Sequence, residues 1–517
     1  MFKNFLRYIT LLLFPIVAMS TPAIAQISKP YKSSIELQAI GTSKRTVPFW
    51  MRSNQYGSIP LSGISTSILG TFGKDYDDEK TVSAFEDKPL LDWGLGIEGR
   101  ANIGQKSNLQ LIQAYAKVKL SIFQAKIGRS KDVMGLNGDT VLSSGNFAES
   151  GNALGIPKIE LSIPNYWRLP FFDGLFAIKG NFSHGWVGKV RILDSITSLP
   201  PHKEVYYINE KYPSTYLHQK SLYIKLGLDS WRLQLYGGFS HQVFWGNEKN
   251  AYGSNFRLSG IETFTYVATG KSYGSEGVPR SKIGNQLGSI DLGVEYKFDT
   301  FNLFVYRQNL YDVGALSKLA NIADGLNGVS IANNLYSSEI EGFQWKKILL
   351  ELFYTKDQAG YPWSIPTKSG DEDYYNNFYY LNGWSYRSLG LGNPLITRRQ
   401  DARAGQAFRE DDYFINNRVA AVNLGFSAGF NSWSYVVKGT YSMNYGTFGT
   451  SKYGNSTGSI RDPRTGDFFK KVPQLSIYLD VTRNLTNGYI LGFSGAYDNG
   501  KLLDNSIGAL LKVKREF

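Results

Sequence analysis

The chain has 517 residues, 15% aromatic residues, a formal net charge of +13 and a mean hydropathy of -0.25. It contains no cysteine, which excludes both a disulfide framework and a lipid anchor on a modified cysteine. The low hydropathy disfavours a bundle of membrane helices, whereas 34 tyrosines and 54 glycines suit a barrel whose residues alternate between lipid and water.

Residues 1–25 predict a secretory signal peptide, and residues 26–517 a single barrel domain. Two basic residues precede a short apolar run, and Ala23-Ile24-Ala25 fits a cleavage site with small residues. The apolar run is well short of the roughly 20 residues that a membrane helix needs. We therefore expect export to the cell outer membrane.

The positive charge is spread along the chain. Loss of Lys3 and Arg7 with the signal peptide lowers the net charge from +13 to +11. A nucleic-acid partner would require lysine and arginine gathered on one face, so none is expected. The charge favours anionic partners such as phosphorylated lipid or acidic glycan only weakly.

Apolar and polar residues alternate repeatedly in the mature chain. In residues 91–102, Leu91, Trp93, Leu95 and Ile97 share one parity, and polar residues occupy the other. Residues 287–298 and 470–483 repeat the pattern. Each run is about the 9 to 11 residues that a tilted strand needs to cross a bilayer. A single such run would fit a soluble sandwich equally well.

Connection lengths favour a membrane barrel, because such barrels have short turns on the periplasmic side and long loops outside. Tight turns are predicted at Asn431-Ser432, Phe343-Gln344, Asp299-Thr300 and Asp229-Ser230. Long loops are predicted between them, at 186–216, 244–286, 311–333, 356–417 and 446–472. Seven further strands are expected near 34–40, 58–71, 91–102, 107–118, 120–128, 156–163 and 174–185.

These runs predict an all-β fold, an antiparallel transmembrane outer-membrane β-barrel of about 18 strands with short periplasmic turns and long extracellular loops. The hairpin at Asp229-Ser230 is expected to pair Leu226 with Leu233 on the lipid face. A slip by one residue would place Lys225 in lipid, at a cost of roughly 2 to 4 kcal/mol.

The same register places His218 opposite His241 at the outer end of this hairpin. Two imidazoles could share a metal or contact lipid phosphate, but rings in an interfacial belt are the simpler explanation. Neither His184 nor His202 lies in a metal-binding motif. No metal or other cofactor is expected.

No nucleophile elbow, phosphate-binding loop or dinucleotide fingerprint is present in a suitable context, so we expect no enzyme. Two lumen carboxylates at the right separation could act as in a glycosidase, but a polar lumen wall is their ordinary role. The carboxylates predicted to face the lumen are Asp92, Glu98, Asp291, Glu295 and Asp480.

The longest predicted loop, 356–417, is rich in aromatic and arginine residues. Aromatic rings could stack on sugars, and guanidinium groups could bind carboxylate or phosphate. Alternatively, the loop packs its own aromatic side chains and closes the barrel mouth. The candidate glycan-binding residues are Tyr361, Trp363, Trp384, Tyr386, Arg387, Arg398, Arg399 and Arg403.

The chain ends in the alternating sequence IGALLKVKREF, which predicts a last strand that pairs with the first. Ile507, Leu511 and Val513 would face lipid. Arg515 interrupts this parity near the membrane boundary, where its charge can reach water. Phe517 resembles the terminal aromatic residue by which barrel-assembly machinery recognises its clients.

Several motifs resemble the Wzi-type capsule-assembly proteins of Gram-negative outer membranes, most densely over residues 34–246. They include SIELQAIGTSKRTVPFWMRSNQYGSIP, AYAKVKLSIFQAKIGRSKDVMGL, GNALGIPKIELSIPNYWRLPF and LQLYGGFSHQVFWG. The resemblance implies an 18-stranded barrel that acts as a surface lectin, without a reaction. Arg129 and Asp132 of the GRSKD stretch are family-motif candidates. Some members carry a periplasmic helical cap, which only 42–57 and 72–90 are free to supply here.

The main interpretation of the sequence is therefore a non-enzymatic outer-membrane lectin that helps capsular polysaccharide attach to the cell surface. Its expected partners are capsular or surface polysaccharide, outer-membrane lipid and lipopolysaccharide, and barrel-assembly machinery during insertion. The alternative is a porin or channel for small solutes. An outer-membrane hydrolase that uses carboxylates and histidines is a third, weaker hypothesis.

Overall fold

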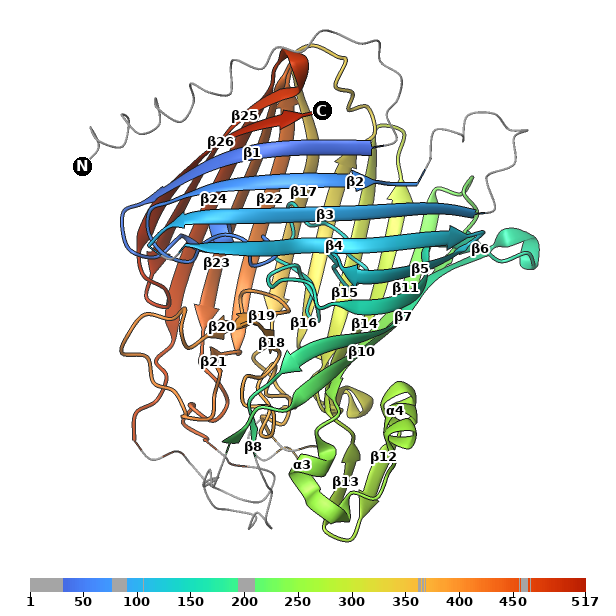
Figure 1. Cartoon of the computed structure of the whole chain (residues 1–517), viewed down its shortest axis with the longest axis vertical. Coiled ribbons are helices and arrows are strands. Elements are labelled where there is room, and N and C mark those ends of the chain that lie inside the picture. Colours follow the sequence, from blue (N-terminus) through green and yellow to red (C-terminus); the bar gives the residue numbers. More distant parts are fainter. Residues whose placement is uncertain are drawn as a thin grey trace.

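The computed structural model describes residues 31–517 except 77–90, 106, 194–209, 361–363, 365, 366, 368, 455, 457–463 and 465. The predicted signal peptide lies outside the described residues. Within them, 18 strands form one closed antiparallel sheet (Figure 1). No helix in the described part of the chain is long and apolar enough to cross a membrane.

The barrel strands follow one another around the wall in chain order. They are β1 (Tyr31–Thr42), β2 (Ser65–Lys74), β3 (Leu91–Gly104), β4 (Asn108–Leu120), β5 (Phe123–Arg129), β6 (Lys158–Arg168), β7 (Phe176–Lys189), β10 (Ser214–Leu226), β11 (Leu233–Trp245), β14 (Asn285–Lys297), β15 (Phe301–Tyr311), β16 (Gly325–Asn333), β17 (Phe343–Tyr354), β22 (Val419–Phe430), β23 (Trp433–Asn444), β24 (Val472–Asn484), β25 (Tyr489–Gly500) and β26 (Ser506–Glu516).

In the described residues, the connections carry short elements. The helices are α2 (Phe49–Arg52), α3 (Glu248–Tyr252) and α4 (Gly260–Thr269), with single 3-10 turns at Phe172–Gly174, Gly253–Asn255, Ala315–Lys318 and Thr486–Gly488. The short strands are β8 (Ile192–Leu193), β9 (Glu210–Lys211), β12 (Ser272–Ser275), β13 (Val278–Lys282), β18 (Ser385–Tyr386), β19 (Leu389–Gly390), β20 (Thr397–Arg398) and β21 (Phe414–Asn416).

Pairing of the first strand with the last closes the barrel, as the sequence predicts. Ile35 of β1 lies opposite Arg515 of β26, and the Phe517 N–H donates to the Ser33 carbonyl at 3.0 Å. Short turns such as 121–122, 298–300 and 431–432 lie at the end of the barrel where β1 begins and β26 ends. Long loops, including 130–157 and 355–418, lie at the opposite, extracellular end (Figure 1).

The strand alternation gives the wall an apolar outer face. On β26, Ile507 is 58% exposed and Leu511 43% exposed, whereas the intervening Leu510 is 5% exposed and faces the interior. Outward leucine, isoleucine, valine and phenylalanine recur on the neighbouring strands. Contact of such an apolar band with hydrocarbon is favourable, and its exposure to water is unfavourable. The chain is therefore a transmembrane barrel of the outer-membrane type.

The predicted turn at Phe343-Gln344 is wrong. These residues begin β17, the turn occupies 334–342, and β16 lies within the stretch that was expected to be a loop. The small inward residues of β16, Gly328 and Ser330, obscure the alternation typical of a strand. Leu335 and Ile340 are apolar residues of the turn that suggest a strand where none forms. Gly328 is required for packing, because a Cβ there would lie 2.1 Å from the Tyr306 ring.

The register of the β10–β11 hairpin also differs from the prediction. Leu226 pairs with Leu235 instead of Leu233, because the turn occupies 227–232 and begins at Gly227 with a φ of 128°. A shift by two residues preserves which side chains face lipid, so the alternation alone cannot detect it. His218 consequently lies opposite Val243 on β11, and not opposite His241.

His218 lies in an aromatic cluster on the outer surface of the wall. Its ring packs against Phe182 at 4.7 Å and against Phe264 of α4 at 5.6 Å, and the side chain is fully buried. On its other side His218 pairs with His184 of β7. Among the described residues, no group of three or more histidine, aspartate or glutamate side chains is arranged to hold a metal ion.

We predict that Gly328→Ala weakens the barrel wall. The added methyl group must displace the Tyr306 ring, whose hydroxyl donates to Glu351, and such overpacking costs about 1–3 kcal/mol. Thermal unfolding, followed by the mobility shift of the folded barrel in gels, should occur at a lower temperature. Gly439→Ala is the control, since a Cβ at Gly439 meets no atom within 4 Å. Equal melting of both variants would contradict the prediction.

Candidate functional site

The loop 130–157, which we call the lumen loop, crosses the barrel interior and is anchored to the far wall by Glu351. This carboxylate on β17 is fully buried. It accepts hydrogen bonds from the Ser143 hydroxyl and the Ser144 N–H, each at 2.6 Å, and from the Asn423 amide at 3.2 Å. A buried carboxylate is tolerated only with such partners, so the loop and the wall hold each other in place.

Asp291 of β14 provides a second anchor for the lumen loop. Its carboxylate accepts from the Leu136 N–H at 2.7 Å and from the Gln308 amide at 3.1 Å. Like Asp291, Glu98 faces the interior as predicted, and it binds Lys131 at the start of the same loop at 2.6 Å. These carboxylates therefore fix a loop and do not simply form a hydrated wall.

The other three carboxylates in the predicted lumen set also have partners. Asp480 pairs with Lys512 at 2.9 Å, Asp92 pairs with Lys74 at 3.3 Å, and Glu295 accepts from the Tyr236 hydroxyl at 2.7 Å.

The family-motif candidates Arg129 and Asp132 lie at the base of the lumen loop. Arg129 donates to the Leu111 carbonyl and to the Tyr386 hydroxyl, both at 2.9 Å. Asp132 lies between Lys126 at 2.9 Å and Lys158 at 3.0 Å. Burial raises the pKa of Asp132, but the two ammonium groups outweigh it and hold the pKa below its usual value. Both residues support the loop structurally.

The longest loop, 355–418, also turns inward, and carboxylates attach its first part to the neighbouring connection 312–324. Glu372 accepts from the consecutive N–H groups of residues 312–315. Asp324 accepts from the Gln358 N–H at 2.8 Å and from the Tyr374 hydroxyl at 2.7 Å. Burial raises the pKa of Asp324 to about 7.

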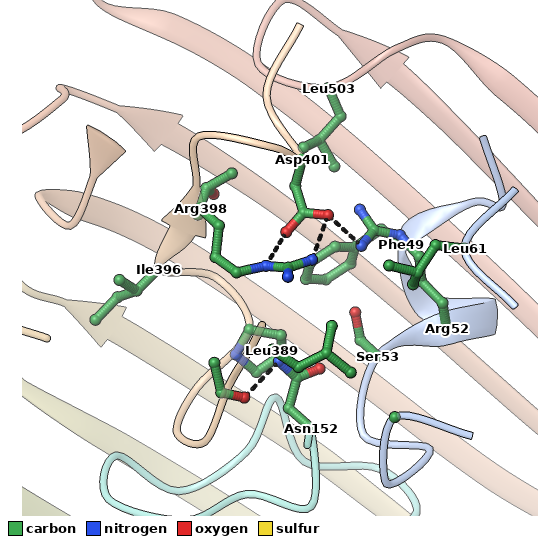
Figure 2. A pocket seen from close by; sticks show the side chains of 14 residues that line it. Phe49, Arg52, Ser53, Leu61, Asn152, Leu389, Ile396, Arg398, Asp401 and Leu503 are labelled. Atoms are coloured by element: carbon green, nitrogen blue, oxygen red, sulfur yellow. Dashed lines mark hydrogen bonds and ion pairs between the residues drawn. The ribbon is translucent and has the colours of Figure 1, made fainter. Parts of the chain in front are cut away.

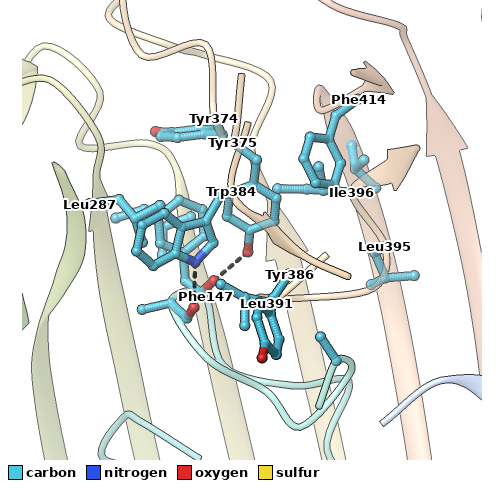
Figure 3. Close-up of a cluster of buried hydrophobic side chains, with 14 of the residues drawn as sticks. Phe147, Leu287, Tyr374, Tyr375, Trp384, Tyr386, Leu391, Leu395, Ile396 and Phe414 are labelled. Carbon is cyan, nitrogen blue, oxygen red and sulfur yellow. Dashed lines mark hydrogen bonds between the residues drawn. The ribbon is translucent and has the colours of Figure 1, made fainter. Parts of the chain in front are cut away.

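Aromatic side chains of this loop form a hydrophobic core inside the barrel (Figure 3). Trp384 is 0% exposed, stacks on Phe244 with ring centroids 4.2 Å apart, and donates from its indole to the Ala148 carbonyl at 2.8 Å. The Tyr375 hydroxyl donates to the Phe147 carbonyl. The structure therefore shows the second of the two alternatives, a loop that packs its own aromatic residues in the barrel mouth.

The candidate glycan-binding residues that the structure describes are not brought together on one exposed surface. Tyr386 is 6% exposed and Arg398 is 4% exposed, whereas Arg387 is exposed beside the Tyr386 ring. Arg399 lies near Glu410 at 3.4 Å, and Arg403 donates to the Asn505 side chain at 2.8 Å. Tyr361 and Trp363 lie outside the described residues.

Arg398 contributes to a charged pocket at the extracellular mouth (Figure 2). Its Nε and Nη2 donate to Asp401 at 2.7 and 2.8 Å, and Arg52 donates to the same carboxylate at 2.7 Å. The pocket holds about 30 Å³, enough for a water molecule. An adjoining cavity of about 140 Å³ shares these three residues and reaches the exposed Asp504.

A larger cavity, the lumen chamber, lies deeper in the barrel. It holds about 230 Å³ between the wall strands β23–β26, β1, the segment around α2 and the tip of the lumen loop. Its polar lining includes Gln38, Asn54, Lys438, Tyr478, Asp480 and Lys512. Lys438, Gln38 and Lys512 were not predicted as site residues, although each lies on the polar parity of a predicted strand.

No protein-family model matches the chain, and no curated protein matches it. Solved structures of similar architecture include OccAB2 of Acinetobacter baumannii, with 12% identity, a TM-score of 0.43, and coverage of 94% of this chain and 98% of that one. OccK2 (OpdF) of Pseudomonas aeruginosa has 8% identity, a TM-score of 0.42, and coverage of 94% and 98%. OccK10 (OpdN) of the same organism has 9% identity, a TM-score of 0.42, and coverage of 95% and 99%. The likeness concerns the barrel fold alone.

The interpretation of the chain as a capsule-polysaccharide lectin is corrected. Trp384 and Tyr386, two of the four aromatic side chains expected to stack on sugar rings, are buried in the barrel mouth, and the other two lie outside the described residues. The solved structures named above are outer-membrane porins, and their likeness to this chain concerns the fold alone. A capsular polysaccharide partner is likewise unsupported, and the porin or channel alternative is the better supported of the two.

We predict that Glu351→Ala releases the lumen loop. The change removes the acceptor of Ser143, Ser144 and Asn423, and hydrogen bonds to charged groups contribute about 1.5–3 kcal/mol each. Amide hydrogen exchange in residues 136–147 should accelerate at least tenfold, with the strands unchanged. Glu341→Ala, in an exposed turn, should leave exchange in the loop unaltered. Unchanged exchange in Glu351→Ala would reject the anchor.

The packing of the 355–418 loop should weaken as pH rises. The pKa of Asp324 is about 7 in the folded protein, against about 3.9 in an unfolded chain, so the folded state binds the proton more tightly. This contribution to stability is complete below pH 4 and is lost between pH 4 and about 7. Proteolysis of the loop should be faster at pH 8 than at pH 5, and Asp324→Asn should reduce the difference. Asp504→Asn, at an exposed site, is the control.

Proposed function

We propose that the protein is an outer-membrane channel for small hydrophilic solutes, with permeation limited by loops that fold into the lumen. The observation that carries the proposal is the lumen chamber, a cavity of about 230 Å³ lined by amide and charged side chains inside a closed barrel. A polar interior of this kind is typical of barrels that conduct water and solutes.

Outside the lumen chamber, the inner face of the barrel wall is also polar and suits hydrated solutes. Inward positions carry lysine, including Lys119 on β4 and Lys179 on β7, and both side chains are partly exposed. The extracellular half, by contrast, is narrowed by the lumen loop and by the core around Trp384. A small conductance is therefore expected.

Further expectations accompany this proposal. Residues 1–25 direct export as a cleaved signal peptide, and the mature chain is one domain without enzymatic activity. The barrel contacts outer-membrane lipid and lipopolysaccharide and is inserted by barrel-assembly machinery. Membership of the Wzi-type family stays a prediction, which can be tested by aligning a set of homologues of this chain.

Conductance in planar bilayers tests the channel. The purified barrel should give small single-channel steps, and replacement of residues 134–154 by a short Gly-Ser linker should enlarge them several-fold, because it removes the lumen loop. The control is a deletion within 257–282, which carries α4, β12 and β13. Residues of this segment pack on the outer surface of the wall, against Val243 and Trp245 of β11, so its loss should leave the steps unchanged. Absence of steps in both the intact barrel and the linker variant would reject the channel.

A further inference from the structure

Lys438 on β23 is a buried cation without an anionic partner. Its side chain is 5% exposed, and it forms no hydrogen bond or ion pair with the residues that the structure describes. Its ammonium nitrogen lies 4.0 Å from the centre of the Trp50 ring and 5.9 Å from that of Tyr478. Aromatic faces attract the cation but do not neutralise it, and an uncompensated buried charge is unfavourable.

The neighbouring carboxylates are already committed to other groups. Asp480 pairs with Lys512 at 2.9 Å. Asp139 pairs with Lys347 at 2.8 Å. Glu351 accepts the hydrogen bonds that anchor the lumen loop. Lys438 therefore faces the lumen chamber with a positive charge that no described carboxylate pairs with.

The position of the ammonium group is fixed by its surroundings. The Trp50 indole donates to the Thr440 hydroxyl at 3.0 Å, and this hydroxyl donates to the Asn423 side chain at 2.7 Å. Trp50 is 1% exposed, so its ring cannot turn away from Lys438 without breaking this chain of contacts. A site whose charged group is held in place before the ligand arrives loses less entropy on binding.

The chamber has the charge and size of a site for a small anion. Among its lining residues, Lys438 and Lys512 are cationic and Asp480 is anionic, which leaves an excess of one positive charge. Gln38 and Asn54 provide amide groups, and Val436 provides an apolar side. A volume of about 230 Å³ equals roughly eight water molecules at about 30 Å³ each, the scale of a small sugar acid.

We propose that the lumen chamber binds small organic carboxylates, whose anionic group pairs with Lys438. The inference rests on the proposed channel function and names its solute class. The amides of Gln38 and Asn54 supply hydrogen bonds to hydroxyl groups of the solute. An anion of this kind compensates the Lys438 charge, which no described side chain does.

Binding and uptake are measured separately on the folded, full-length barrel. Gluconate serves as the anionic probe and glucose as a neutral molecule of similar size. Titration calorimetry in detergent should show gluconate binding that is at least tenfold weaker in Lys438→Met and retained in Lys438→Arg. Uptake into proteoliposomes should favour gluconate over glucose, and Lys438→Met should abolish this preference.

Lys179→Met is the matched control. Lys179 also faces the lumen and lies over aromatic rings, at 4.9 Å from Tyr166 and 5.4 Å from Tyr223, but it does not line the chamber. Its loss should change gluconate binding less than twofold. The gel mobility shift of each variant before and after heating confirms that the barrel has folded.

The possible outcomes separate the two proposals. Absence of gluconate binding in the unmodified barrel, or equal loss in Lys438→Met and Lys179→Met, would overturn the anion site. Solute uptake without an effect of Lys438→Met would also overturn it and leave the channel standing. Binding that depends on Lys438 without any uptake would support the site and reject the channel.

Discussion

Backbone hydrogen bonding in a medium without water is the constraint on which this structure depends. A strand in hydrocarbon cannot leave its N–H and C=O groups unpaired, so a transmembrane sheet must close. The pairing of β1 with β26 satisfies this requirement at the last seam, where Ile35 lies opposite Arg515. Closure creates an interior, and the candidate site of this chain lies within it.

Buried carboxylates decide how the interior is filled. Glu351 and Asp291 project inward from the wall and accept hydrogen bonds from the lumen loop. Glu372 and Asp324 fix the 355–418 loop to neighbouring turns in the same manner. An anchor of this type is specific because a buried carboxylate that loses its donors is strongly unfavourable. The barrel is therefore an ordered, partly filled container whose remaining space is the lumen chamber.

The lumen chamber differs from the rest of the interior in its electrostatics. Lysines at the base of the lumen loop, such as Lys126 and Lys158, are matched by Asp132. Lys438 is held by Trp50 and Tyr478 and faces open space. This contrast between Lys438 and the paired lysines of the lumen loop is the basis of the proposed anion site.

Much of the wall could be predicted from alternation, because each strand carries its own two-residue period. The runs at 91–102, 287–298 and 470–483 all occur as strands. Prediction failed where the alternation of apolar and polar residues gives no information. In β16, the small residues Gly328 and Ser330 obscure the alternation, so the strand was not recognised. In the β10–β11 hairpin, a shift of two residues leaves every side chain on the same face of the sheet. The candidate site was predicted less well, since aromatic and arginine residues look alike in sequence whether they are exposed or packed inside.

The sequence by itself determined the class of fold, the closure at Phe517 and the faces that meet lipid, because these follow from local periodicity and chain-end pattern. Only the tertiary structure decided that the long loops turn inward, that Trp384 is buried, and that Lys438 has no carboxylate partner among the described residues. Those outcomes depend on contacts between distant residues, such as Ser143 with Glu351 and Trp50 with Lys438. The local sequence pattern does not predict which distant residue a polar side chain will contact.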